Sequence, residues 1–418
     1  MNKCNEVLDS LNQVTLFFAN LKQPYKCNRK NIRVLVHLLR KLPDFRNKRK
    51  VTYELANLIA ICFIFAMRGR FQSFYDVAMR LKANPKEFIR LGLVEKDKLP
   101  SHDTFRRVFM YINANKLRDI FLNEMKSFLE TIVSLDKESK NKKRIISGDG
   151  KAFKGSGRKG KFGNLNVFNI YDVSNGLCLS STPLTDKESE IAEFERLITK
   201  FNIDDAIITA DALHCQRKLC NKIVSHKGEY VIKVKNNQAE LKNEMIHCFE
   251  TNKFPIISET FNSCDYQIMK LSNTYIGCDW PGQAAYIKMV SRKRIKQKDY
   301  NPEDQYFIAS FTNANCIMEA IDNRWCIENE LHLFKDTYLK EDECTFYNKN
   351  CVKVMATINN IVYGLYRISN SILNNKQMCF TRYMFEDDPL NVISLVLPYL
   401  KDKDLPKLFK ENMRGKPA

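Results

Sequence analysis

The sequence is poor in glycine and proline, has no long apolar run and lacks paired cysteine motifs. Its 418 residues include 14 Gly and 12 Pro, too few for a collagen-like or linker-dominated chain. The longest apolar run covers residues 58–67, whereas a membrane-spanning helix needs about 18 or more. The first twenty residues include Glu6 and Asp9 and lack an apolar signal core. We therefore expect a cytoplasmic protein with no membrane partner.

The 14 cysteines are dispersed along the chain, and no two have the spacing C-x-x-C. The closest pair is Cys215 and Cys220. Structural zinc sites use short paired spacings with histidine partners, so the pattern disfavours such a site. It predicts reduced thiols in a cytoplasmic protein.

Acidic residues are outnumbered, because 48 Asp and Glu face 67 Lys and Arg and give a formal net charge of +19. The bases concentrate in residues 21–50, 151–161 and 292–298, and again after Tyr399. A single basic run is commonly only a solvated face. Several separate runs favour a polyanion, such as nucleic acid, lying across more than one segment.

Residues 1–138 have the pattern of a helical N-terminal domain. At roughly 150 residues per domain, the length of the chain suggests two or three domains. Ser101 is a candidate helix N-cap, and apolar residues follow it at helical spacing: Phe105, Val108, Phe109 and Ile112. Such a helical domain serves either DNA-end binding or packing and dimerisation, and both interpretations stay open. Residues 376–418 are interpreted as a basic C-terminal tail.

Residues 139–375 have the pattern of an α/β domain. Strands are expected at 144–150, 165–173, 177–183, 206–211 and 229–235, with helices at 188–201 and 213–225. This order predicts a mixed sheet with flanking helices. Residues 240–305 contain short β-like pieces and are interpreted as a β-rich insertion. A last strand at 306–311 and helices at 316–339 and 351–372 complete the domain.

Two aspartates end predicted strands. Asp149 ends the first strand and Asp211 ends the fourth. Functional groups in open α/β sheets gather at the carboxyl ends of strands, where two carboxylates could share a divalent cation. Acids at strand ends also serve as helix caps or turn residues, so position alone leaves both interpretations open.

A third acid, Glu328, lies in a predicted helix. At about 100° per residue, Arg324, Glu328, His332 and Lys335 fall within an arc of roughly 80°. In isolation this is an ordinary surface stripe of salt-bridged residues. Interleaved apolar residues favour a packed helix whose polar stripe faces a cleft; they are Trp325, Ile327, Leu331 and Phe334.

Four segments together resemble the DDE transposases of bacterial insertion sequences, in the branch that includes the H-repeat-associated proteins. They are Asp149-Gly150-Lys151 and residues 211–216, 235–238 and 325–332. Residues 100–105 resemble the N-terminal associated domain of that branch, and the resemblance covers about residues 30–370. Two departures are Ile321, where related enzymes often carry tyrosine, and Lys187-Glu188-Ser189-Glu190-Ile191, where Lys-Ser-Asn-Glu-Ile is usual.

The resemblance implies a ribonuclease-H-like fold in which Asp149, Asp211 and Glu328 are the catalytic, metal-binding acids. Carboxylates suit two Mg²⁺ ions, for which Mn²⁺ can substitute, and such ions assist phosphodiester transfer. Repulsion among the acids predicts weak metal affinity until DNA supplies phosphate oxygens.

The implied function is a transposase that cuts double-stranded DNA at terminal inverted repeats and joins the ends to target DNA. The implied assembly is a homodimer on DNA in the cytoplasmic nucleoid. A catalytically silent DNA-binding protein and a nuclease without strand transfer are the alternatives. Retained end binding without cleavage would indicate the first, and a joining assay separates the second.

Further residues of the motifs are candidate DNA contacts. Lys151, Arg324 and Lys335 either contact phosphates or pair with the acids. Three others end a strand at the same edge and are expected to face DNA: Lys235, Asn237 and Gln238. His332 either orients Glu328, contacts DNA or is a hydrogen-bonded core residue. Trp280 either stacks on a base or is buried in the insertion.

Overall fold

The computed structural model describes residues 27–135, 143–157, 165–184, 187–275, 277–291, 304–373 and 378–401. The chain divides into two compact units. The first comprises residues 1–137, 153–164 and 334–418, and the second comprises residues 138–152 and 165–333. The predicted basic segment at 292–298 lies outside the described residues, as do residues 402–418 of the predicted C-terminal tail, whereas residues 378–401 of that tail contain two helices of the first unit.

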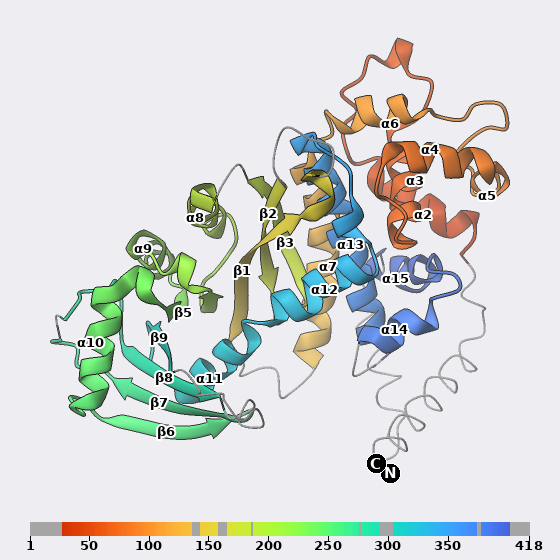
Figure 1. The fold of residues 1–418 in the computed structure, drawn as a ribbon. Coiled ribbons are helices and arrows are strands. Elements are labelled where there is room, and N and C mark those ends of the chain that lie inside the picture. The colour runs from red at the N-terminus through yellow and green to blue at the C-terminus, as the bar shows by residue number, and fades with distance from the viewer. Residues whose placement is uncertain are drawn as a thin grey trace, which may run out of the picture. The chain divides into compact units, whose positions relative to one another are not determined.

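The first unit is helical (Figure 1). Its elements before residue 137 are α2 (Arg29–Leu39), η1 (Lys48–Lys50), α3 (Leu55–Met67), α4 (Phe74–Ala83), α5 (Pro85–Arg90), α6 (His102–Phe109) and α7 (Ala114–Leu135). The later ones are η3 (Lys154–Gly157), α12 (Leu333–Thr337), η7 (Glu341–Glu343), α13 (Lys349–Ile372), α14 (Met378–Met384) and α15 (Asn391–Lys401). Helix α12 begins at the boundary between the units.

Helix α3 is the centre of the first unit, because nearly all of its residues are buried and both α2 and α13 pack against it. The side chain of Ser101 accepts a hydrogen bond from the backbone N–H of Thr104, which confirms the predicted N-cap of α6. Within the described residues, no helix combines the length and the apolar character needed to cross a membrane.

The second unit contains one nine-stranded sheet in the order β3-β2-β1-β4-β5-β9-β8-β7-β6. The strands are β1 (Arg144–Phe153), β2 (Leu165–Asp172), β3 (Leu177–Leu184), β4 (Ala206–Ala210), β5 (Glu229–Val234), β6 (Ile256–Phe261), β7 (Cys264–Lys270), β8 (Ala285–Ser291) and β9 (Gln305–Ala309). Strands β1, β4 and β5 are parallel, whereas β5 pairs antiparallel with β9. The predicted α/β class with a mixed sheet is confirmed.

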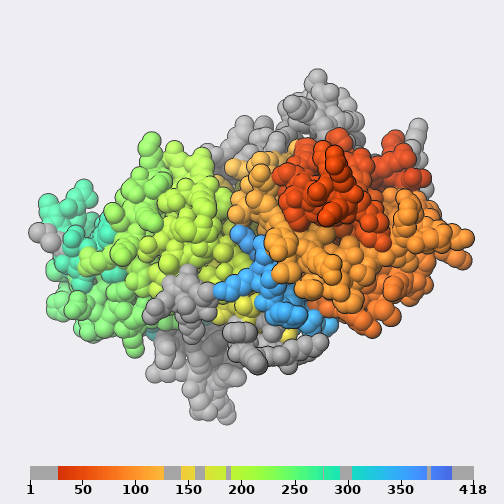
Figure 2. Space-filling view, turned by 90° about the horizontal axis from the view of Figure 1, so that it is seen from above, coloured from red at the N-terminus to blue at the C-terminus, as the bar shows by residue number. Residues whose placement is uncertain are grey.

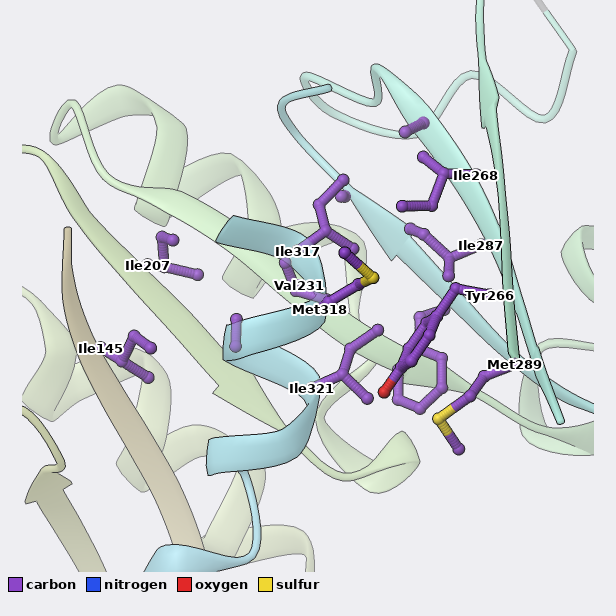
Figure 3. Close-up of a cluster of buried hydrophobic side chains, with 14 residues drawn as sticks. Ile145, Ile207, Val231, Tyr266, Ile268, Ile287, Met289, Ile317, Met318 and Ile321 are labelled. Carbon is purple, nitrogen blue, oxygen red and sulfur yellow. The ribbon is translucent and has the colours of Figure 1, made fainter. Parts of the chain in front are cut away.

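Helices cover both faces of this sheet. Helix α11 (Ala314–Asn323) packs on one face, where Ile145, Ile207 and Val231 meet Ile317 and other residues of the helix (Figure 3). Side chains alternate between faces along a strand, so Gly148 of β1 lies on the opposite face from Ile145. Phe194 of α8 (Lys187–Ile198) lies against Gly148, which places α8 opposite α11.

The segment interpreted as an insertion extends the same sheet. Strands β6, β7 and β8 form an antiparallel run that joins the sheet through β9. Helix α10 (Ala239–Glu250) precedes this run and was not predicted. The helix predicted from residue 213 starts as the 3₁₀ turn η4 (Ala212–His214), and the α-helix α9 covers only Arg217–Ser225.

The prediction of one regular helix over residues 316–339 is wrong. Helix α11 ends at Asn323, and a π-helical segment, η6 (Ile327–His332), follows before α12. A π turn widens the helix by one residue, so it breaks the 100° spacing on which the predicted polar stripe depended. Periodicity alone does not reveal such an insertion.

Candidate active site

Asp149 lies within β1, and Asp211 directly follows the neighbouring parallel strand β4. Gly148 of β1 is in register with Ala210 of β4, so the next residue of each chain segment is one of the two aspartates. Because parallel strands run in the same direction, both acids lie at the carboxyl edge of this part of the sheet. The predicted position of Asp211 at the end of its strand is confirmed. Asp149 does not end the first strand as predicted, because β1 continues to Phe153 and only its pairing with β4 stops at Gly148.

Glu328 enters from the π segment η6, and Arg324 directly follows α11. Arg324 is only 6% exposed, and its Nη1 lies 3.9 Å from Oδ1 of Asp211. Asp211, Glu328 and Asp149 all interact electrostatically with this guanidinium. Its Nε is buried and has no hydrogen-bond partner among the described residues. The three predicted acids thus surround a buried cation that keeps one donor unused.

The carboxyl group of Asp149 is in an unfavourable place for a negative charge. Burial, followed by repulsion from Glu328 and Glu190, raises its pKa to about 7, although Arg324 acts in the opposite direction. Burial likewise raises the pKa of Glu328; Arg324 opposes this change and the charge of Asp211 adds to it.

Asp211 behaves in the opposite way. Burial raises its pKa, but the backbone N–H of Ala212 and the cations Lys235 and Arg324 outweigh that effect and bring the pKa below its ordinary value. Nζ of Lys235 lies 3.5 Å from Oδ2 of Asp211, and both side chains are substantially exposed. Lys235 therefore keeps an ammonium group at the surface beside the acids.

His332 lies between Asn169 and Asp149. Its Nε2 is 3.0 Å from Nδ2 of Asn169, and its Nδ1 is 3.6 Å from Oδ2 of Asp149. Ser181 donates a hydrogen bond to Oδ1 of Asn169, so the amide group of Asn169 is the donor toward His332. The proton of the imidazole is then assigned to Nδ1, which faces Asp149. The buried His332 contacts Asp149 rather than the predicted Glu328.

The remaining predicted contacts differ in accessibility. Lys151 is buried in the second unit, and Lys335 is 1% exposed within the first unit. The amide groups of Asn237 and Gln238 donate to the backbone carbonyls of Ala212 and Cys215. These two amides hold the turn that follows Asp211.

The two tryptophans differ in exposure, and only one of them lies where the sequence pattern predicted. Trp280 is buried, and its Nε1 donates to Sγ of Cys220, as the buried alternative predicted. Trp325 was expected to pack in the core but is 47% exposed. The guanidinium of Arg324 lies 4.2 Å from the centroid of its ring. Trp325 lies in the turn between α11 and η6, so the regular helix assumed for the prediction does not extend to it.

Sequence reasoning missed two residues beside the acids. Glu190 repels Asp149, and Nε2 of the buried His214 lies 3.1 Å from Oε1 of Glu190. Glu190 occupies the position of the glutamate in the usual Lys-Ser-Asn-Glu-Ile segment, and His214 belongs to the segment around Asp211. The glycines on both sides of Asp149 were the available signal of a close neighbour.

The donor chemistry of this site fits a divalent cation, because carboxylates are the oxygen ligands that Mg²⁺ and Mn²⁺ prefer. The raised pKa of Asp149 reflects burial and, after it, repulsion from Glu328 and Glu190, and a bound cation would favour the charged carboxylate. Among the described residues, no group of three or more His, Cys, Asp or Glu side chains is arranged to hold a metal ion. The buried guanidinium of Arg324 instead supplies positive charge to the acids.

Comparisons with known proteins agree with the resemblance. Residues 130–365 match the Transposase DDE domain family, and residues 36–124 match the DDE_Tnp_1-associated family. Two relatives are from Escherichia coli (strain K12). "Putative protein YbfL" is 27% identical over 349 residues, which cover 78% of this chain and 88% of the relative. "H repeat-associated putative transposase YhhI" is 26% identical over 351 residues, with the same two coverages.

One solved structure is also similar, the piggyBac transposase synaptic complex with hairpin DNA. It aligns with 98% of this chain and 85% of its own chain, at 11% identity and a TM-score of 0.39. At that score, the likeness carries no conclusion about this chain.

Proposed function

Because this chain belongs to the Transposase DDE domain family, we propose that it cuts double-stranded DNA at the terminal inverted repeats of a mobile element and joins the freed 3′-hydroxyls to target DNA. The observation that supports this proposal best is the grouping of Asp149, Asp211 and Glu328 around Arg324. Ion pairs that serve stability alone do not need three acids to share one buried cation.

In this proposal, the carboxylates of Asp149, Asp211 and Glu328 hold two divalent cations. These are Mg²⁺ ions, and Mn²⁺ can replace them. Such cations, when bound, neutralise phosphate charge and assist both the attacking and the leaving oxygen. The acids carry surplus negative charge in the protein alone, so cation affinity is low until DNA supplies further oxygens.

Neighbouring residues have positioning and binding roles. His332 directs its Nδ1 toward Asp149 and is held there by Asn169, which fixes the direction of that carboxylate. The unused Nε of Arg324 is a donor suited to a phosphate oxygen. The exposed ammonium of Lys235 can contact the DNA backbone at the same edge.

Further DNA contacts are proposed for the first unit. Helix α2 carries exposed basic side chains that line a groove with Glu54 and Gly92: Arg29, Lys30, Arg33, His37 and Arg40. The surface near the N-terminal end of the described chain is shown in red in Figure 2. The positive charge of this groove suits a polyanion such as DNA. We further propose that the protein acts in the nucleoid as a homodimer that brings two DNA ends together.

The test uses the purified full-length chain, labelled element-end DNA and Mg²⁺. We expect nicking of the end and, with target DNA added, joined products. Glu328→Gln should abolish both while end binding is retained. Glu330→Gln is the matched control, because Glu330 lies in the same segment and accepts a hydrogen bond from Tyr171 that glutamine can also accept.

Three results would contradict or narrow the proposal. Unchanged cleavage by Glu328→Gln would refute the site assignment. Cleavage without joining would indicate a nuclease, and binding without cleavage would indicate a silent DNA-binding protein. The affinity for DNA should also fall steeply with salt, and an affinity independent of salt would argue against the DNA partner.

A further inference from the structure

A fourth acid lies beside β1, on the helix that covers the face opposite α11. Glu190 and Phe194 are one turn apart on α8, and they meet β1 at Gly150 and Gly148, on either side of Asp149. A Cβ atom on Gly148 would lie 2.6 Å from the ring of Phe194, and one on Gly150 would lie 2.6 Å from Oε2 of Glu190. Neither position has room for a side chain. Asp149 therefore stands between two glycines because α8 presses directly against the strand there.

The carboxylate of Glu190 is held from its other side by His214. Their side chains are 13% and 1% exposed, and Nε2 of His214 lies 3.1 Å from Oε1 of Glu190. The imidazole packs against the rings of Phe168 and Phe194, with centroid distances of 5.3 and 5.1 Å. This packing leaves the imidazole little freedom to turn.

The proton of His214 can be assigned from its surroundings. Its Nδ1 is buried and has no hydrogen-bond partner among the described residues. Buried N–H groups without an acceptor are rare, so we place the proton on Nε2, which then donates it to Glu190. This hydrogen bond holds the carboxylate of Glu190 against Gly150 of β1.

We infer that Glu190 is a fourth acidic residue of the catalytic centre, which His214 positions beside Asp149 so that its charge increases the affinity of the centre for divalent cations. This inference rests on the proposed function. Glu190 contacts His214, three residues after Asp211, and Gly150, next to Asp149. It therefore links the two acid-bearing segments. Glu190 is one of the charges that act on Asp149, so its effect reaches the acid assigned to the metal.

The first test is Glu190→Gln in the full-length chain. Glutamine keeps the size of the side chain and can still accept the hydrogen bond from His214, so only the charge is lost. The probe is Mn²⁺, and its binding is measured by electron paramagnetic resonance with and without element-end DNA. We expect the Kd for Mn²⁺ to rise roughly three- to tenfold, with a parallel rise in the Mg²⁺ concentration needed for half-maximal cleavage.

Glu193→Gln is the matched control for this substitution. It removes the same charge from the same helix, but Glu193 forms an ion pair with Arg196 one turn away. The control should bind Mn²⁺ as the wild type does. Equal Mn²⁺ binding by wild type, Glu190→Gln and Glu193→Gln would overturn the inference, because a purely structural Glu190 predicts that result.

A second pair of variants tests the geometry without removing the charge. Gly150→Ala should push Glu190 away from β1, lower the melting temperature and weaken Mn²⁺ binding while all four acids remain. Adding Glu190→Ala should restore part of the melting temperature, since the clash is then gone. A Gly150→Ala variant with wild-type melting and Mn²⁺ binding would contradict the proposed contact.

Failure of the inference can be distinguished from failure of the proposed function. If the wild type cleaves DNA and Glu190→Gln has an unchanged Mn²⁺ requirement, the function stands and the role of Glu190 falls. If the wild type does not cleave DNA, but Glu190→Gln alone weakens Mn²⁺ binding, the cation-binding role of Glu190 stands without the proposed reaction.

Discussion

Strand β1 and the segment directly after β4 each carry an aspartate, and the two aspartates have opposite electrostatic surroundings. Burial, followed by repulsion from Glu328 and Glu190, raises the pKa of Asp149 to about 7. Asp211 accepts the backbone N–H of Ala212 and faces Lys235 and Arg324, so its pKa is lowered. The strands are neighbours and parallel, so the difference comes from what each aspartate contacts and not from the fold of the backbone.

This difference indicates a division of tasks within one acidic centre. Asp211 is charged without help, because the protein itself supplies its counter-charges. Asp149 carries the repulsion that a cation would relieve. Arg324 joins the two regions, since it interacts with both aspartates and with Glu328.

The largest change in stability is expected when the guanidinium of Arg324 is removed. Arg324→Gln leaves three acids without their buried cation, which should cost about 3–5 kcal/mol of unfolding free energy. Added Mg²⁺ should recover part of the loss in this variant. Urea unfolding with and without Mg²⁺ measures both effects. Arg196→Gln, which breaks an exposed pair with Glu193, is the control and should change little. An equally small loss in Arg324→Gln would contradict the central position of Arg324.

The next effect concerns the pH dependence that Asp149 gives the protein without metal. The folded chain keeps the proton of Asp149 up to about pH 7, whereas the unfolded chain releases it near pH 4. The folded state thus binds more protons in this window, so stability is greatest below it and falls as pH rises through it, by up to about 1.4 kcal/mol per pH unit. Asp149→Asn should remove this slope, and unfolding curves across the window measure it. A slope retained by Asp149→Asn would have another origin.

Asp211→Asn should change the unfolding free energy at neutral pH in the opposite direction to Asp149→Asn, and by a smaller amount. It removes a carboxylate whose charge the folded state favours, so we expect a loss of about 1 kcal/mol at neutral pH. At the same pH, Asp149→Asn should be more stable than the wild type. Thermal unfolding of the two variants and the wild type tests the comparison. A change of stability in the same direction for both variants would contradict it.

The smallest effect is expected for Lys235→Met. The pair with Asp211 is exposed on both sides, so its loss should cost less than about 1 kcal/mol. The pKa of Asp211 should rise toward its ordinary value, because one of the charges that lowers it is gone. Carboxyl carbon chemical shifts measured against pH report the change, and an unaltered pKa would assign the shift to Ala212 and Arg324 alone.

Local patterns in the sequence were sufficient to predict which strands position the two aspartates. The predicted strands led to the correct order of β1 to β5 along the chain. Asp211 then directly follows β4, and Asp149 lies in β1 one residue past its last pairing with β4. Ser101 was recognised as an N-cap because that signal involves only neighbouring residues.

Features that depend on contacts distant in the sequence were missed. Helix α11 ends before Trp325 and the π segment η6 follows it, so a regular 100° spacing placed Trp325 in the core although it is exposed. The approach of Glu190 to Gly150 joins residues 40 positions apart and has no periodic pattern. The motif around Glu328 selected an acid that interacts with Arg324, as Asp149 and Asp211 do, even though the helix was misjudged.

The central claim is that Asp149 and Asp211 act in one reaction despite their opposite surroundings. Cleavage of element-end DNA by Asp149→Asn and Asp211→Asn, measured together with their melting temperatures, tests it most directly. The account predicts that both variants bind the end and lose cleavage by about a thousandfold or more, although one is more stable than the wild type and the other less. Substantial cleavage by the stabilised Asp149→Asn variant would contradict it.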